Sequence, residues 1–189
     1  SPFFPLHGKR TELQNMALFD QHLHSRLSVD SEADPRANVQ AAVGRVQLRR
    51  LDTMVEARRH IAEERTRMLA EAEELALPFE PADCRHSFYL YTVLVPRSWA
   101  GAGRDRLCAM LREDYRVNTV IANPPVHSTV PFLRAHVGDV HLPVCEDVGA
   151  RLFCPPIHPA MSDHDNRYIC AAILDAVARL RRELRTGTG

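Results

Sequence analysis

The longest regular pattern of apolar and polar positions covers residues 38–75. Its apolar members recur at seven-residue intervals in two neighbouring rows: Met54, Ile61, Met68 and Leu75, with Val55, Ala62 and Leu69. Apolar residues at this spacing form one buried face of an amphipathic helix. The opposite face is charged and is predicted to be mostly solvated: Arg49, Arg50, Glu56, Arg58, Arg59, Glu63, Glu64 and Arg65. Because no glycine or proline occurs between Gly44 and Pro78, the sequence predicts one continuous helix over residues 38–76.

Shorter elements follow this helix. Runs of β-branched and aromatic residues predict strands at 87–95, 117–121 and 153–157, with a loop at 123–127. Helices are expected at 104–113 and 144–152. This order predicts an α/β or α+β lobe, in which helices cover a small sheet.

A last helix is predicted to begin at Ser162, with Asp165 three residues on as in a capping box. Its inner face is expected to consist of apolar residues at helical spacing: Ile169, Ala172, Ile173, Ala176 and Leu180. Four arginines near its end suit the helix dipole.

Composition excludes several classes of protein. The chain has 24 basic and 24 acidic residues and a formal net charge of zero, so no nucleic-acid or anionic-membrane partner is expected. No apolar run is long enough to span a bilayer, and the first residues lack the features of a signal peptide. The five scattered cysteines include no Cys-x-x-Cys pair, which predicts a reduced, cytoplasmic protein without a disulfide framework or a cysteine-based zinc site.

The single lysine and one pair of histidines are candidates for catalysis and metal binding. Lys9 is the only lysine among the 24 basic residues, so any mechanism that requires a lysine amine within this chain must use it. His22 and His24 are spaced so that both would point to one face of a strand, as metal ligands can. Without a third ligand in view they are interpreted as surface residues, and no metal site is expected.

Several segments, taken in order, resemble the carboxy-terminal portion of the DegT/StrS family of sugar aminotransferases. The longest begins at Asn38 with the sequence Asn-Val-Gln-Ala-Ala-Val-Gly-Arg-Val-Gln-Leu. A Pro-Pro-Val-His loop at 124–127 is similar to the family's substrate-side loop. The remaining matches follow the same order along the chain: residues 51–52, 58–62, 104–105, 131–134, 142–147 and 156–163.

The resemblance implies the small domain of a fold-type I enzyme that uses pyridoxal phosphate, with a mainly antiparallel sheet. Residues 1–37 would be the tail end of the large-domain cofactor segment or an irregular lead-in, and residues 38–189 the small carboxy-terminal domain. The implied reaction moves an amino group from glutamate or glutamine to a keto sugar, often nucleotide-linked, or to a cyclitol. Sites of this family are built across two subunits, which implies a homodimer.

The family chemistry requires a lysine that forms a Schiff base with the cofactor. In one register, His7 and Gly8 match a pair that follows the lysine loop, and the lysine lies before residue 1. In a second register, residues 3–7 are the lysine segment and His7 replaces the lysine, as in the family's sugar 3-dehydratases. Lys9 itself is a third candidate, although a lysine in a polar opening segment is usually solvated. Distance to the predicted helix favours the first register, and the glycine-rich stretch expected in the second is absent.

Two departures from the family pattern affect the cofactor and substrate sites. The family's Asn-x-Arg before the helix, which reaches the cofactor phosphate of the neighbouring subunit, falls on Ala33 and Pro35. Neither side chain donates a hydrogen bond to phosphate. Asn38 and Arg36 are nearby polar residues but not the motif residues in this register, and Asn38 is kept as the cofactor-binding candidate. The family's tyrosine before the Pro-Pro loop is Asn123. A non-catalytic relative that completes another subunit's site is therefore an open alternative, beside the aminotransferase and the histidine-based dehydratase.

The resemblance gives three candidate substrate-binding residues. His127 matches the family's loop histidine near the sugar and follows a stiff Pro-Pro pair. Asn123 would hydrogen-bond a sugar hydroxyl or satisfy a turn, and Arg134 would bind a nucleotide phosphate or remain solvated. His158, in a proline-rich turn, is expected to be structural.

Overall fold

The computed structural model describes the backbone of residues 35–187 and the side chains of residues 39–187. His7, Lys9, His22, His24 and Ala33 lie outside the described residues, as does the Asn38 side chain. The chain divides into two compact units, Ser1–Asp52 and Thr53–Gly189. The proposed division of roles between residues 1–37 and 38–189 stays a prediction. Within residues 35–187, every helix is too short or too polar to cross a bilayer.

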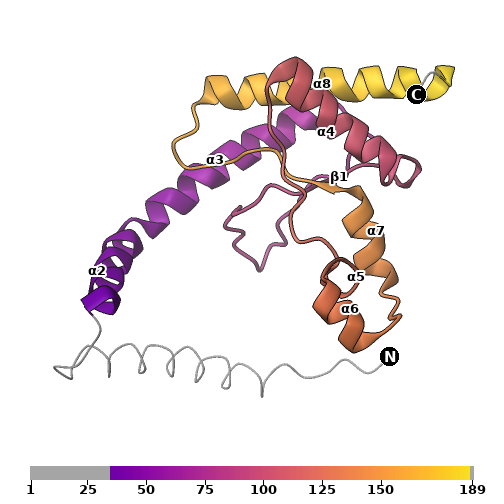
Figure 1. Ribbon diagram of the computed structural model, residues 1–189. Helices are drawn as coiled ribbons and strands as arrows, with labels where there is room; N and C mark the ends of the chain where they lie inside the picture. The colour runs from indigo at the N-terminus through magenta and orange to yellow at the C-terminus, as the bar shows by residue number, and fades with distance from the viewer. Residues whose placement is uncertain (1–34, 188–189) are drawn as a thin grey trace. The chain divides into compact units, whose positions relative to one another are not determined.

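The predicted continuous helix over 38–76 is wrong in its extent. The chain forms α2 (Pro35–Arg49) and α3 (Leu51–Leu69), with a turn at Arg50 between them (Figure 1). At that turn the Arg50 N–H donates to the Gln47 carbonyl at 3.0 Å, three residues back rather than four. An i→i−3 bond of this kind tightens the backbone and ends the regular α-helical ladder.

The second helix ends seven residues before the pattern predicts. After Leu69 the backbone makes two further turns, each closed by a hydrogen bond from an N–H to the carbonyl three residues back. The Ala76 N–H then donates to the Leu94 carbonyl at 2.9 Å. Ala76 is therefore at the edge of the sheet, and Pro78 follows it. Leu75 is buried as the apolar pattern predicts, but from a turn rather than from a helix.

The sheet is small and antiparallel, as expected. Strand β1 (Val93–Leu94) pairs with β2 (Leu152–Phe153), with Val93 opposite Phe153. Isolated bridges extend the ladder on both sides, from Ala76 to Leu94 and from Val120 to Cys154. The predicted strands at 87–95, 117–121 and 153–157 each reduce to one or two paired residues.

The first of these strands is shortened by an unusual backbone conformation at Phe88. Its φ is +45°, a left-handed value that interrupts extended backbone. Its N–H donates to Nδ1 of His86 at 2.8 Å, so it is not available for pairing with a neighbouring strand. The aromatic side chain is nevertheless buried and packs against Tyr91. Phe88 and Tyr91 are therefore buried without forming a strand.

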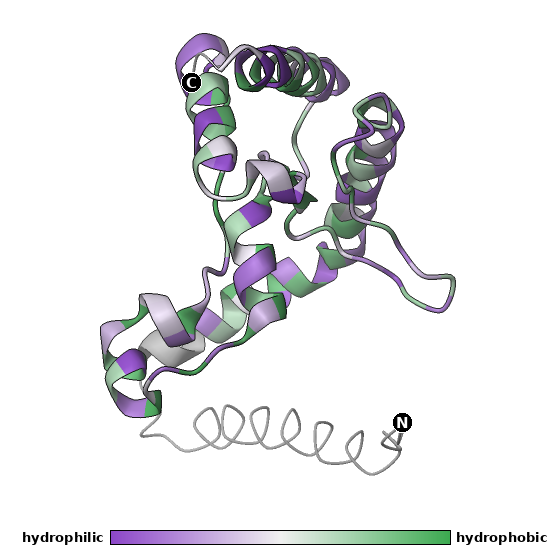
Figure 2. Cartoon of the chain, turned by 90° about the vertical axis from the view of Figure 1, so that its right-hand side faces the viewer, coloured by the Kyte–Doolittle hydropathy of each residue, from purple (hydrophilic) through white to green (hydrophobic). Residues whose placement is uncertain are grey.

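The Thr53–Gly189 unit contains further helices, among which α4 packs on strand β2. They are η1 (Arg97–Trp99), α4 (Ala102–Tyr115), α5 (Val126–Thr129), α6 (Pro131–Val137), α7 (Pro143–Arg151) and α8 (Asp163–Thr186). Helix α4 packs on α8, β2 and η1, α7 packs on η1, and α5 packs on α6 (Figure 1). Figure 2 shows hydrophobic and hydrophilic residues interspersed along the helices, as expected for helices with one buried face. The fully buried side chains include Val93, Leu107, Leu111, Phe153 and Ile173.

The last helix matches its prediction. The Ser162 hydroxyl accepts a hydrogen bond from the Asp165 N–H at 3.1 Å and donates to the Asp165 carboxylate at 2.7 Å. All five predicted inner-face residues are buried. Local sequence is sufficient here, because the cap and the apolar spacing both lie within the element.

Arg65 contradicts its prediction as a solvated residue, because its exposed fraction is 0%. Its Nε donates to Asn166 Oδ1 at 3.0 Å and its Nη2 donates to the Pro156 carbonyl at 2.9 Å. The guanidinium lies 5.1 Å from the Tyr91 ring centroid. Asn166 Nδ2 in turn donates to the Ile61 carbonyl at 3.1 Å. This buried polar network connects α3 with the start of α8.

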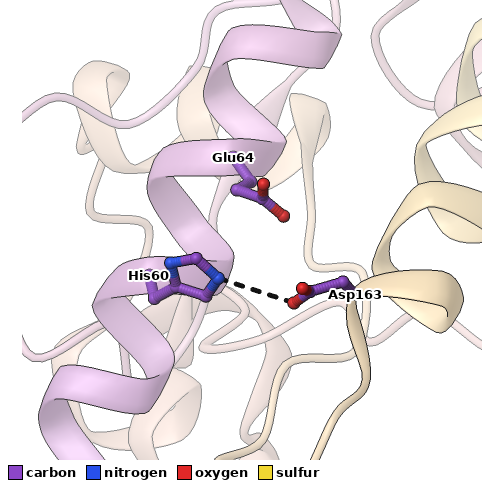
Figure 3. A group of neighbouring side chains, drawn as sticks. All are labelled: His60, Glu64 and Asp163. Atoms are coloured by element: carbon purple, nitrogen blue, oxygen red, sulfur yellow. Dashed lines mark ion pairs between the residues drawn. The ribbon is translucent and has the colours of Figure 1, made fainter.

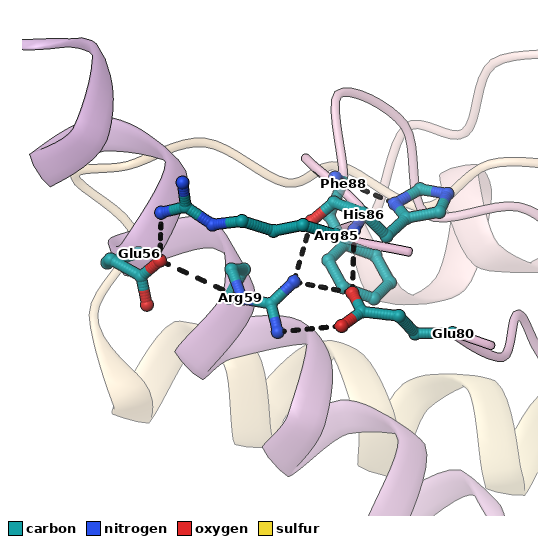
Figure 4. Close-up of polar contacts among 6 residues, drawn as sticks. All are labelled: Glu56, Arg59, Glu80, Arg85, His86 and Phe88. Carbon is teal, nitrogen blue, oxygen red and sulfur yellow. Dashed lines mark hydrogen bonds and ion pairs between the residues drawn. The ribbon is translucent and has the colours of Figure 1, made fainter. Parts of the chain in front are cut away.

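An ion-pair network fixes the loop after α3 (Figure 4). Arg59 Nη1 and Nη2 donate to the two carboxylate oxygens of Glu80 at 2.5 and 2.9 Å, and Nη1 also donates to the His86 carbonyl at 3.0 Å. The His86 N–H donates to Glu80 Oε2 at 2.7 Å. Arg59, followed by the His86 N–H, lowers the pKa of Glu80 from 4.5 to about 2.

This network predicts a specific pH dependence of stability. Because the pKa of Glu80 is lower in the folded protein, its ionised form stabilises the fold above pH 4.5, and this contribution disappears as the pH falls towards 2. We expect Glu80→Gln to be less stable than the wild type at neutral pH, with a difference that shrinks in acid. Urea unfolding across this pH range measures the difference in unfolding free energy between the variant and the wild type. Glu73→Gln is the control, because Glu73 is exposed. A pH-independent difference for Glu80→Gln would contradict the assignment.

Candidate functional site

The Pro-Pro-Val-His segment is only partly the predicted loop. Asn123 to Pro125 form the connection, but Val126 and His127 already belong to the short helix α5. The Pro125 ring lies directly on α7 at Gly149, where a Cβ atom would be 2.6 Å from Cγ and 2.7 Å from Cδ of the proline. The absence of a side chain at Gly149 thus allows the close contact that positions α5.

Gly149→Ala is expected to displace this connection. The added methyl would overlap a stiff proline ring, and overpacking of this kind costs about 1–3 kcal/mol of unfolding free energy. Alanine's better helix propensity offsets about 1 kcal/mol of that loss. Gly44→Ala is the matched control, because its Cβ would meet nothing within 4 Å in α2. Equilibrium unfolding in urea compares the two, and equal stabilisation by both substitutions would refute the Pro125 contact.

His127 is held by a carboxylate on the neighbouring helix. Its Nε2 lies 3.1 Å from Glu146 Oε1, and the same oxygen accepts a hydrogen bond from the Leu142 N–H at 2.9 Å. The Leu142 N–H, followed by His127, lowers the pKa of Glu146. An ionised carboxylate only accepts hydrogen bonds, so Nε2 of His127 carries the proton in this arrangement and Nδ1 is the nitrogen left for a ligand. The His127 side chain is only 10% exposed, which makes it a positioned residue rather than a free surface histidine.

Arg134 and His127 line the same cavity. The cavity has a volume of about 310 Å³ and is formed by residues of α5, α6, the connection between α6 and α7, and α7: His127, Ser128, Arg134, Gly138, Asp139, Val140, His141 and Glu146. Arg134 lies on α6, which the sequence pattern does not predict, and it is exposed. Within the described residues its guanidinium has no carboxylate partner closer than 4.0 Å. It is therefore available to bind an anion bidentately.

Asn123 lies in a different cavity. That cavity, of about 540 Å³, is lined mainly by apolar residues of α7: Leu142, Pro143, Val144, Cys145, Val148 and Gly149, with Leu152 at its end. Asn123 has a φ of +50°, a left-handed conformation that asparagine tolerates better than most residues. This conformation is compatible with a role in the turn. Asn123 does not line the cavity of His127, and its role in binding a sugar hydroxyl stays a prediction.

Sequence reasoning missed Glu146, the residue that positions His127. Nineteen residues separate the two in sequence. One signal was present: Glu146 stands in the first turn of a helix that begins with proline, where a carboxylate can reach back to a free backbone N–H. Its bond to the Leu142 N–H is of this type.

The described residues do not form a complete site for pyridoxal phosphate. None of them is a lysine, so within residues 35–187 no amine is available for a Schiff base. The roles of His7, Lys9 and Asn38 in cofactor binding rest on side chains outside the described part and stay predictions. What the described residues do contain is a cavity to which His127, Arg134 and Glu146 contribute polar side chains.

The fold defines the class: helices with a small antiparallel sheet, like the corresponding part of a sugar aminotransferase. A model of the DegT/DnrJ/EryC1/StrS aminotransferase family matches residues 31–174, and the chain belongs to this family.

Individual relatives support the same family assignment. The chain is 31% identical to the spore coat polysaccharide biosynthesis protein SpsC of Bacillus subtilis over 74% of its own length and 36% of that protein's. It is 33% identical to dTDP-3-amino-3,4,6-trideoxy-alpha-D-glucose transaminase of Micromonospora megalomicea, over 79% of this chain and 37% of that enzyme. The aminotransferase TlmJ of Streptoalloteichus hindustanus superposes with a TM-score of 0.65 at 32% identity, over 74% of this chain and 36% of the other. The chain thus spans little more than a third of these proteins.

Proposed function

We propose that this chain is the carboxy-terminal portion of a pyridoxal-phosphate-dependent aminotransferase that transfers an amino group from glutamate or glutamine to a nucleotide-linked keto sugar. The observation that supports this proposal best is the cavity shared by His127 and Arg134 in a chain of this family. Two related enzymes act on dTDP-linked sugars according to their names, which favours a nucleotide-linked substrate over a cyclitol.

The described side chains suit two parts of such a substrate. His127, held by Glu146, would present Nδ1 to a sugar hydroxyl, because its Nε2 is occupied. Arg134 would bind a phosphate oxygen pair through its planar guanidinium. The two residues would thus orient the sugar and its nucleotide, whereas the reacting amine would come from elsewhere.

Aminotransferases of this family depend on pyridoxal phosphate. When bound, this group supplies the electron sink for moving the amino group. Because the described residues include no lysine, we infer that the Schiff-base amine is contributed by a segment outside them. No step of the chemistry is assigned to Lys9 or His7.

A homodimer in the cytoplasm is the assembly that best suits this proposal. Helix α2 exposes three valines at one helical face, Val39, Val43 and Val46, with exposed fractions of 51–64%. Apolar rows of this kind usually mark surfaces covered by other protein.

The test is amination of dTDP-linked keto sugars by the natural protein that contains these 189 residues. Glutamate is supplied as donor, and products are identified by mass spectrometry. Aminated sugar is the expected product, and His127→Ala is expected to raise the KM for the sugar by about tenfold, the loss of one hydrogen bond. His164→Gln, an exposed histidine on α8, is the matched control.

Other outcomes would contradict the proposal in distinct ways. Loss of water from the sugar without amination would identify a histidine-based dehydratase. The absence of any product, with activity restored only by a second subunit, would identify a non-catalytic partner. An unchanged KM in His127→Ala would remove the histidine from the sugar site.

A further inference from the structure

Three side chains with metal-binding atoms meet between α3 and α8, away from the residues of the proposed sugar cavity. His60 and Glu64 are one turn apart on α3, and Asp163 is the first residue of α8. One ligand atom from each residue lies within 4.8 Å of the other two. Figure 3 shows the His60 ring facing the Asp163 carboxylate, with the Glu64 carboxylate directed towards the same gap.

Ordinary hydrogen bonds do not account for this arrangement. His60 Nε2 and Asp163 Oδ1 are 3.5 Å apart, longer than a usual hydrogen bond. Glu64 Oε1 is 3.3 Å from Arg67 Nη2, but Glu64 Oε2 is shielded from solvent and accepts no hydrogen bond within the described part of the chain. A shielded carboxylate oxygen without a partner is costly unless a donor or a cation satisfies it.

The spacing fits a tetrahedral metal ion. Two ligands at about 2.1 Å from a zinc ion, in tetrahedral positions, are roughly 3.4 Å apart. The separation of His60 Nε2 and Asp163 Oδ1 is 3.5 Å. The three ligand atoms lie within 4.8 Å of one another, so the Glu64 carboxylate would move towards the other two ligands when an ion binds. Two carboxylates also balance the charge of a divalent cation, and one imidazole with carboxylates suits zinc.

We propose that His60, Glu64 and Asp163 bind a Zn²⁺ ion that joins α3 to the first turn of α8, with water as the fourth ligand. The site is structural and independent of the proposed transferase function, because it shares no residue with the cavity of His127. Sequence spacing alone does not reveal it, since Asp163 is about a hundred residues beyond His60. Zinc that binds only the folded chain raises its thermal unfolding midpoint.

The test is calorimetric titration of the full chain with zinc chloride. Cys84 and Cys145 are exposed free thiols and would bind zinc themselves, so all variants are made in a Cys84→Ser/Cys145→Ser background. We expect one zinc ion per chain at micromolar concentration. Affinity should fall by more than about tenfold in His60→Gln and in Asp163→Asn, because loss of a direct ligand costs at least as much as loss of its supporting partner.

His164→Gln is the matched control, since it removes an exposed histidine beside the site that is not a proposed ligand. It should retain the affinity and the zinc-dependent rise in unfolding midpoint, and both should be lost in His60→Gln. Circular dichroism confirms that each variant is folded. The proposal is overturned if all variants bind zinc with equal affinity, or if the background chain does not saturate at micromolar zinc.

Discussion

Arg65→Ala is expected to destabilise the Thr53–Gly189 unit by about 3 kcal/mol or more. The substitution leaves the Asn166 side-chain oxygen and the Pro156 carbonyl without their donor, and each unsatisfied buried group costs about 1–3 kcal/mol. It also opens a cavity beside Tyr91. Burial lowers the pKa of the Arg65 guanidinium, so the charge itself is costly, and its removal returns part of this loss.

Two further variants separate these contributions. Arg65→Met fills the space and removes the buried charge, so it is expected to lose less stability than Arg65→Ala. Arg67→Ala is the control on the same helix, because Arg67 is exposed and pairs with Glu64 only at the surface, which is worth about 0–1 kcal/mol. Chemical denaturation measures all three. Wild-type stability in Arg65→Ala would contradict the role of this network.

Glu146→Ala is expected to lower kcat/KM for the keto sugar about as much as His127→Ala does. It removes the acceptor shared by His127 Nε2 and the Leu142 N–H, so the imidazole loses its fixed orientation and the start of α7 loses a bond. Because Glu146 acts on the sugar through His127, the expected loss is about tenfold in kcat/KM for the keto sugar, the same order as for His127→Ala.

Steady-state kinetics of the natural protein that contains this chain measures the effect. Glu146→Gln keeps an acceptor oxygen of the same shape and is expected to fall between Glu146→Ala and the wild type. Glu73→Ala, an exposed carboxylate outside the cavity, is the control. If Glu146→Ala matches the control, Glu146 does not position a residue of the sugar site.

The parts of the fold that the sequence predicts are those whose determinants lie within one element. The cap at Ser162, the buried face of α8 and the helix at 144–152 depend on residues a few positions apart, and the structure contains all three. The same holds for the buried row that ends at Leu69. Local spacing, capping and apolar period are sufficient at these places.

The parts of the fold that the sequence does not predict depend on residues far apart in the chain. Arg65 is buried because Pro156 and Asn166, about a hundred residues later, supply its acceptors. Leu75 keeps its predicted burial but not its helix, because Ala76 pairs with Leu94. At the candidate site, the motif identifies His127, whereas its partner Glu146 is found only once α7 is in place.

The scarcity of lysine decides which segment can supply the Schiff-base amine. A transaminase needs an amine that bonds to the cofactor, and the sequence has a single lysine, Lys9, which lies outside the described residues. The described residues would then supply the helix-and-sheet lobe and the cavity of His127 and Arg134, and another segment would supply the Schiff-base amine.

The most direct measurement adds pyridoxal phosphate to the isolated 189-residue chain, reduces it with borohydride and maps any pyridoxyl group by peptide mass spectrometry. We predict no stoichiometric labelling of Lys9, and no difference between the folded chain and the chain in urea. One pyridoxyl group per chain on Lys9, formed only in the folded state, would contradict the central claim.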